Sequence, residues 1–132
     1  MASEGRVSLS LNISKGNLQE VKSYSTTFDV TSGKGPSPGA ITVPTSGVNV
    51  SFDNLSDPGP CVIYNLDSTN YVSYGTWDGA TFTALGEIPA GQFAYIPRVA
   101  ATLDAGTGTS GPNLRLVADT ASCNVQVLAY DR

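Results

Sequence analysis

Apolar and polar side chains alternate one by one along several separate stretches of this chain. The first stretch, residues 7–13, reads V-S-L-S-L-N-I, and similar alternation recurs at 24–30, 48–52 and 125–129. Successive side chains of a β-strand point to opposite faces, so a period of two is typical of strands with one apolar face. No stretch keeps the helical period of 3.6. The pattern therefore predicts strands and turns from end to end. We expect strands at residues 7–13, 22–30, 41–43, 48–52, 61–65, 71–77, 81–85, 92–97, 114–118 and 125–130.

The residues that break strands fall between these stretches. The chain has 14 Gly and 8 Pro, and 132 residues fit one domain with a single core. Short strands with frequent turn signals indicate a sandwich or barrel. We predict one all-β domain over residues 1–132, an antiparallel β-sandwich of about eight to ten short strands, with the jelly roll as one form of it. Residues 1–5 are expected to be a flexible lead, and residues 31–40 and 104–113 to be loops.

Asp78-Gly79 lies between two β-prone runs and predicts a hairpin with a two-residue turn. In that register Trp77 pairs with Ala80 and Gly75 pairs with Phe82. The Trp77 side, which holds the larger rings, is expected to face the core. Tyr74 would then point away from the core.

Charge and hydropathy argue against several classes of partner. The chain has 7 basic and 11 acidic residues and a formal charge of -4, and the basic residues form no cluster. Phosphate neutralisation needs clustered Lys and Arg, so we expect no nucleic-acid partner. The first residues lack the pattern of a signal peptide, and the apolar runs are too short to cross a bilayer. We expect no membrane association, and synthesis in a cytoplasm.

The residue types present offer little for catalysis or metal binding. The chain has no His, which removes the commonest general base and metal ligand, and we expect neither an enzyme nor a cofactor. Paired carboxylates of a glycosidase, or calcium at Asp53, Asn54 and Asp57, remain alternatives. The G-x-G-x-x-G match at 106–111 lacks a following helix and is read as a loop.

The two cysteines, Cys61 and Cys123, lie within or beside expected strands. They have no CxxC spacing, so a zinc site is not expected. We predict two small buried apolar residues, with a disulfide across the sandwich as the alternative.

The second half of the chain carries a family resemblance. It contains N-L-D-S-T-N-Y-V at 65–72, I-P-A-G-Q-F at 88–93 and V-Q-V-L-A-Y-D at 125–131. These segments resemble small β-rich proteins encoded among the structural genes of tailed bacteriophages, in which an N-L-D-x-T-N-Y-V-like strand precedes a P-G-E-like turn. In this chain Ala90 separates the Pro from the Gly, and Gln92 replaces the acid.

The resemblance implies a virion component, and within that class a capsid decoration or cement protein on the capsid surface. Its partners would be the major capsid protein and further copies of itself in a homotrimer. Contacts are expected from the N-terminal segment and the 31–40 loop, with Lys34, Pro36 and Pro38, and from Tyr74. The alternative is a receptor- or carbohydrate-binding module of a tail fibre or tail tip, with Tyr74 as a stacking platform.

Overall fold

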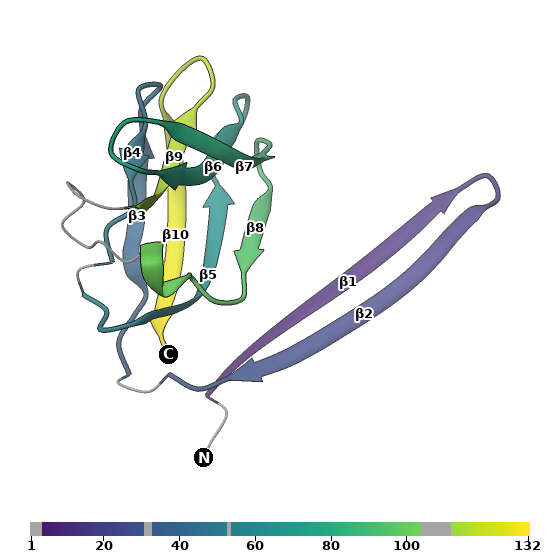
Figure 1. The fold of residues 1–132 in the computed structure, drawn as a ribbon. Coiled ribbons are helices and arrows are strands. Elements are labelled where there is room, and N and C mark those ends of the chain that lie inside the picture. The colour runs from purple at the N-terminus through teal and green to yellow at the C-terminus, as the bar shows by residue number, and fades with distance from the viewer. Residues whose placement is uncertain (1–3, 31–32, 53, 104–111) are drawn as a thin grey trace.

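The computed structural model describes residues 4–30, 33–52, 54–103 and 112–132 (Figure 1). Within them the chain is all-β, as the alternation predicts. Apart from one short 3-10 helix, Ala101–Leu103, the regular elements are the strands β1 Gly5–Lys15, β2 Leu18–Phe28, β3 Ser37–Val43, β4 Val48–Asn49, β5 Pro58–Asn65, β6 Val72–Trp77, β7 Phe82–Ile88, β8 Phe93–Ile96, β9 Asn113–Ala118 and β10 Cys123–Asp131.

Two four-stranded antiparallel sheets form the body of the molecule. One has the order β3-β10-β5-β8 and the other β4-β9-β6-β7. Along the chain from β3 to β10, every connection passes from one sheet to the other except that between β6 and β7. Two sheets joined in this order form an eight-stranded jelly roll, so the predicted β-sandwich is confirmed.

The core lies between the two sheets and follows the period of two. In β10 the side chains of Cys123, Val125, Val127 and Ala129 are fully buried, while the residues between them are half-buried or exposed. Leu114 and Leu116 of β9 face them from the other sheet. Both cysteines are buried and free, which confirms the prediction and removes the disulfide alternative.

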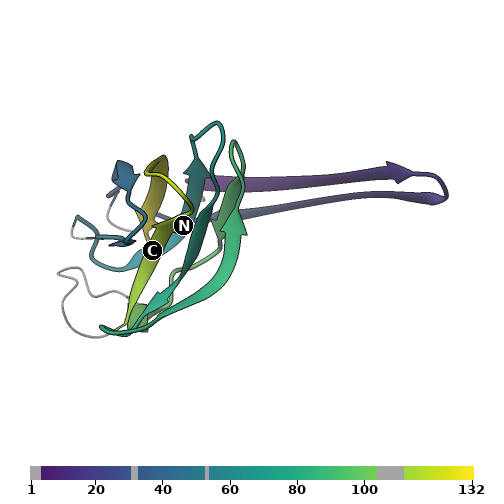
Figure 2. The ribbon, with the colours of Figure 1, turned by 90° about the horizontal axis from the view of Figure 1, so that it is seen from above.

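Strands β1 and β2 belong to neither sheet. Among the described residues they pair only with each other, over their whole length from Gly5↔Phe28 to Lys15↔Leu18. This hairpin, residues 5–28, extends away from the sandwich in both views and is called the arm below (Figures 1 and 2). The sequence predicts both strands but not their position outside the sandwich.

The predicted β6–β7 register is wrong. Trp77 pairs with Phe82 and Gly75 with Ala84, because the turn has four residues, 78–81, instead of two. The Asp78 carboxylate accepts hydrogen bonds from the backbone N–H groups of Ala80 (2.8 Å) and Thr81 (2.7 Å), which stabilises the longer turn.

The predicted orientation of this hairpin is also wrong. Tyr74 lies on the inner face of its sheet, half-buried against the core. Trp77 lies on the outer face, where the Arg115 guanidinium stacks 3.9 Å from its ring centroid. A cation covering one face of the indole lets Trp77 stay outside the core at little cost.

The predicted loops are partly strand. β3 begins at Ser37, so Pro38 is a strand residue that pairs with Leu128. Gly5 begins β1, and Asn113 begins β9. Residues 1–3 of the expected flexible lead, residues 31–32 of the first loop, and residues 104–111, which include the G-x-G-x-x-G match, lie outside the described part of the chain.

Candidate interaction surface

The two faces of the arm differ sharply in polarity. Residues opposite each other in an antiparallel pair share a face, and here Val7 pairs with Thr26, Leu9 with Tyr24 and Leu11 with Lys22. One face therefore collects the large apolar side chains, and we call it the apolar arm face: Gly5, Val7, Leu9, Leu11, Ile13, Leu18, Tyr24 and Phe28, with Lys15, Glu20, Lys22 and Thr26 among them. The opposite face carries mainly Ser, Thr, Asn and Gln, together with Arg6 and the 74% exposed Val21.

Most of the apolar arm face is open to solvent. Every residue from Ser8 to Thr27 is exposed, and Leu9, Leu18 and Tyr24 expose 49%, 57% and 60% of their surface. Single exposed apolar residues are common on protein surfaces, whereas a continuous apolar stripe marks an interaction site. The arm is therefore the candidate functional element of this protein.

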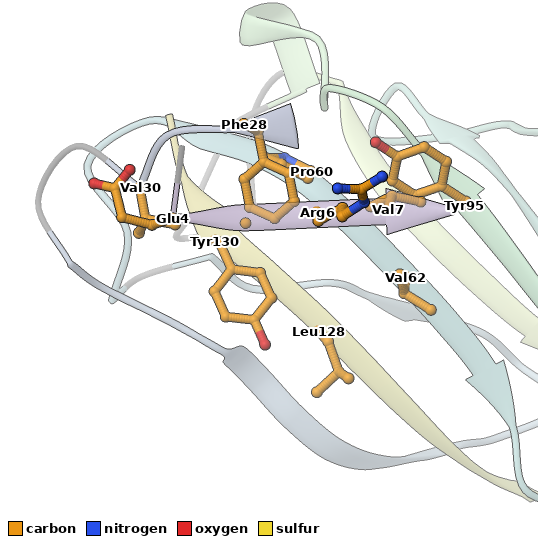
Figure 3. A pocket seen from close by; sticks show the side chains of 11 residues that line it. Glu4, Arg6, Val7, Phe28, Val30, Pro60, Val62, Tyr95, Leu128 and Tyr130 are labelled. Carbon is orange, nitrogen blue, oxygen red and sulfur yellow. The ribbon is translucent and has the colours of Figure 1, made fainter. Parts of the chain in front are cut away.

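In the part of the chain that the structure describes, only the base of the arm packs on the sandwich. The Phe28 ring lies over Gly5, where a Cβ atom would collide with it, and its centroid is 6.4 Å from that of Tyr130. An open cavity of about 390 Å³ remains between this base and the sheet, and its lining includes Val62, Leu128 and Tyr130 (Figure 3). The apolar arm face thus turns toward the sandwich at its base.

The sheet surface under the arm is itself apolar. We call it the outer sheet face, made of Pro60, Val62 and Tyr64 from β5, Phe93 and Tyr95 from β8, and Leu128 and Tyr130 from β10. Tyr64 and Phe93 pair across β5 and β8, and Phe93 is 61% exposed. A second cleft of about 600 Å³ separates this end of the sheet from residues 7–9 of the arm. Two apolar faces therefore diverge from a common junction.

The structure places three of the four predicted contact residues near this junction. Lys34 is exposed, its Nζ donates a hydrogen bond to Ser56 Oγ (3.2 Å), and its carbonyl accepts one from the Asp131 N–H (3.2 Å). Pro36 is exposed and Pro38 is half-buried in β3. Tyr74 belongs to the other sheet and is not part of this surface.

The geometry does not favour the alternative sites, which are a glycan-stacking platform at Tyr74 and a metal site. The half-buried ring of Tyr74 packs on the core and is no open stacking platform. Among the described residues no group of three or more His, Cys, Asp or Glu side chains lies close enough to bind a metal ion, and Asp53 lies outside them. No helix in the described ranges has the length and hydropathy to cross a membrane.

Two acidic residues, the half-buried Asp67 and the exposed Asp78, have turn-forming roles. Backbone N–H groups of Asn70 and Thr69 lower the pKa of Asp67, and those of Thr81 and Ala80 lower the pKa of Asp78. Both carboxylates accept these hydrogen bonds within their own turns, and this is the geometry of an Asx-turn.

Comparisons of the chain with protein-family models, curated proteins and solved structures find no match. The arm is the candidate functional element that the sequence alone does not predict. Gly16-Asn17, which lies between the two alternating stretches, is a hairpin signal from which the β1–β2 pairing could have been predicted.

Proposed function

We propose that this protein is a structural component of a tailed-phage virion, a capsid decoration protein that binds the major capsid protein at the capsid surface. The observation that carries the proposal is the arm, an apolar hairpin that extends from a jelly-roll body. A protein that stabilises a shell needs a compact body to rest on it and an extended element to reach a neighbouring molecule, and this chain has both.

Two further features support the proposal. The formal charge of -4 suits the outer surface of a capsid better than the DNA-facing side, because DNA repels an acidic protein. The exposed loop with Lys34 and Pro36 lies beside the base of the arm, since its Gly35 contacts Tyr130. In the proposed arrangement this loop contacts the shell and the arm reaches the neighbouring molecule.

The proposal is tested with capsids that lack the protein. Purified protein is added to such particles, and binding is measured by co-sedimentation and located by electron microscopy. We expect density on the outer shell and a higher temperature of capsid rupture. Pro36→Asp should weaken binding, while Thr83→Asp in β7 of the other sheet, also exposed and adding the same single charge, is the matched control. Protein located at the tail tip, or binding to a glycan array, would refute the decoration role.

A further inference from the structure

We propose that the arm of one copy of this chain packs its apolar face on the outer sheet face of a second copy. Each copy would give one arm and receive one, and the copies would close into a symmetric ring. The inference does not depend on the virion assignment, because it concerns only contacts between copies of the purified chain.

The junction within one chain already shows the kind of contact that is proposed. At the base, Phe28 of the apolar arm face packs beside Tyr130 of the outer sheet face. Beyond Val7 the same arm face is exposed, and on the sheet the side chains of Tyr64 and Phe93 are exposed as well, with no described segment of the chain covering them. Because the arm diverges from its own sheet, its free part meets such a sheet only in another copy (Figures 1 and 2).

The arm also needs a partner for its own stability. An isolated two-stranded hairpin is marginally stable in water, and in the single chain residues 8–27 form such an exposed hairpin. Burial of the Leu9, Leu11 and Ile13 side chains against another sheet would supply the apolar contact that an isolated hairpin lacks.

The charges of arm and body are complementary. Residues 5–28 carry three basic side chains, Arg6, Lys15 and Lys22, against one acid, Glu20. The remainder from residue 29 onward carries four basic and nine acidic side chains. A cationic arm is therefore attracted to the anionic body of another copy, and such complementarity favours association between them.

The size of the arm favours a closed assembly. The eight residue pairs beyond Val7↔Thr26, from Ser8↔Ser25 to Lys15↔Leu18, span about 27 Å, and a hairpin of about 10 Å width buries roughly 540 Å² when both surfaces are counted. This is below the roughly 1,200–2,000 Å² of a stable interface between two proteins. In a ring each copy takes part in two such contacts, so release of one copy requires breaking both.

The first experiment measures the mass of the full chain by light scattering over a range of concentrations. We expect one discrete species whose mass is a multiple of 13.7 kDa. Leu11→Asp should weaken self-association about tenfold or more, because it places a charge in the contact. Ser10→Asp, on the polar face of the arm, is the matched control and should leave the assembly intact.

The receiving face is tested in the same way. Phe93→Asp should also weaken self-association, whereas Leu85→Asp should not, although Leu85 is 67% exposed on the other sheet. Circular dichroism shows whether each variant keeps its β-structure. A chain that is monomeric at every concentration, or that forms open polymers, would overturn the proposal.

A second experiment identifies the contact directly. Chains with Leu11→Cys are mixed with separately tagged chains with Phe93→Cys, so that a mixed disulfide can form only between copies. We expect this product to exceed that from Ser10→Cys with Phe93→Cys, and equal yields would overturn the proposal. Both measurements use purified protein and need no capsid. A wild type that self-associates through the arm but does not bind capsids would therefore contradict the decoration role and leave the arm contact standing.

Discussion

At the scale of single residues, the closing strand is held by one buried carboxylate. Asp131 is fully buried, and its Oδ1 accepts hydrogen bonds from the backbone N–H groups of Ser56 (2.8 Å) and Asp57 (3.1 Å). The segment that leads into β5 is thereby fixed to the end of β10. A buried N–H group that loses its acceptor is no longer compensated for the water that it lost on folding. Removal of the Asp131 carboxylate should therefore lower the free energy of unfolding more than removal of a surface carboxylate does.

We predict that Asp131→Ala lowers the free energy of unfolding by about 3 kcal/mol, because two N–H groups lose their acceptor. Asp131→Asn keeps a carbonyl oxygen at the same place and should cost clearly less. Urea denaturation followed by circular dichroism measures both. Equal losses for the two variants would show that the acceptor oxygen is not what stabilises this end of the sandwich.

The buried thiol of Cys61 makes the free energy of unfolding decrease at alkaline pH. Burial raises the pKa of its thiol from 9.0 to about 12. The unfolded chain therefore releases this proton at lower pH than the folded chain does. The stabilisation is complete below pH 9.0 and falls as pH rises toward 12, by about 1.4 kcal/mol per pH unit in that window.

The corresponding prediction compares Cys61→Ala with Val127→Ala by measuring the free energy of unfolding against pH. Both variants lose buried volume and should be less stable near neutral pH. Between pH 9 and pH 11 the free energy of unfolding should fall less for Cys61→Ala than for the wild type, because the Cys61 thiol is gone. For Val127→Ala it should fall as much as for the wild type. Parallel curves for the two variants would contradict the role assigned to the thiol.

At the scale of elements, the strands could be predicted because their signals are local. All ten expected strands exist, although their ends differ by several residues. The β6–β7 register could not be predicted from Asp78-Gly79 alone. The backbone N–H groups of Ala80 and Thr81 donate hydrogen bonds to the Asp78 carboxylate, and these hydrogen bonds stabilise a longer turn. Gly75 then lies against the backbone of Thr83 and Ala84 instead of under Phe82.

The position of the arm could not be predicted either. Alternation shows that residues 7–13 have one apolar face, but it does not show what covers that face. For the same reason the sequence does not predict that the apolar arm face is exposed. The loop at Lys34 does lie next to the arm base, whereas Tyr74 packs against the core.

The arm turn gives a prediction at this scale. Gly16, at a φ of 58°, and Asn17 connect β1 to β2, and no described non-glycine residue has a positive φ. This is the pattern of a type II′ turn, in which the first central residue is Gly. Gly16→Ala should therefore speed amide hydrogen exchange in β1 and β2 and leave the urea midpoint of the sandwich unchanged. Asn17→Ala is the control, and equal exchange in both variants would contradict the turn assignment.

At the scale of the whole molecule, the uneven distribution of charge allows arm docking to be distinguished from non-specific apolar association by its dependence on salt. Apolar contacts alone are not weakened by moderate salt, whereas attraction between a basic arm and an acidic body is screened by it. We therefore expect the self-association of the wild type to weaken as salt concentration rises. The affinity can be followed by sedimentation velocity at several salt concentrations.

Reversal of the arm charge should reverse this dependence. With Lys15→Glu and Lys22→Glu the arm becomes acidic and is repelled by the acidic body, so self-association weakens at low salt and partly recovers as salt screens the repulsion. Lys34→Glu with Arg98→Glu changes the net charge by the same amount but makes the body more acidic, so it should not weaken arm docking. If the two double variants behave alike, net charge alone governs association, and the attraction between arm and body has no part in it.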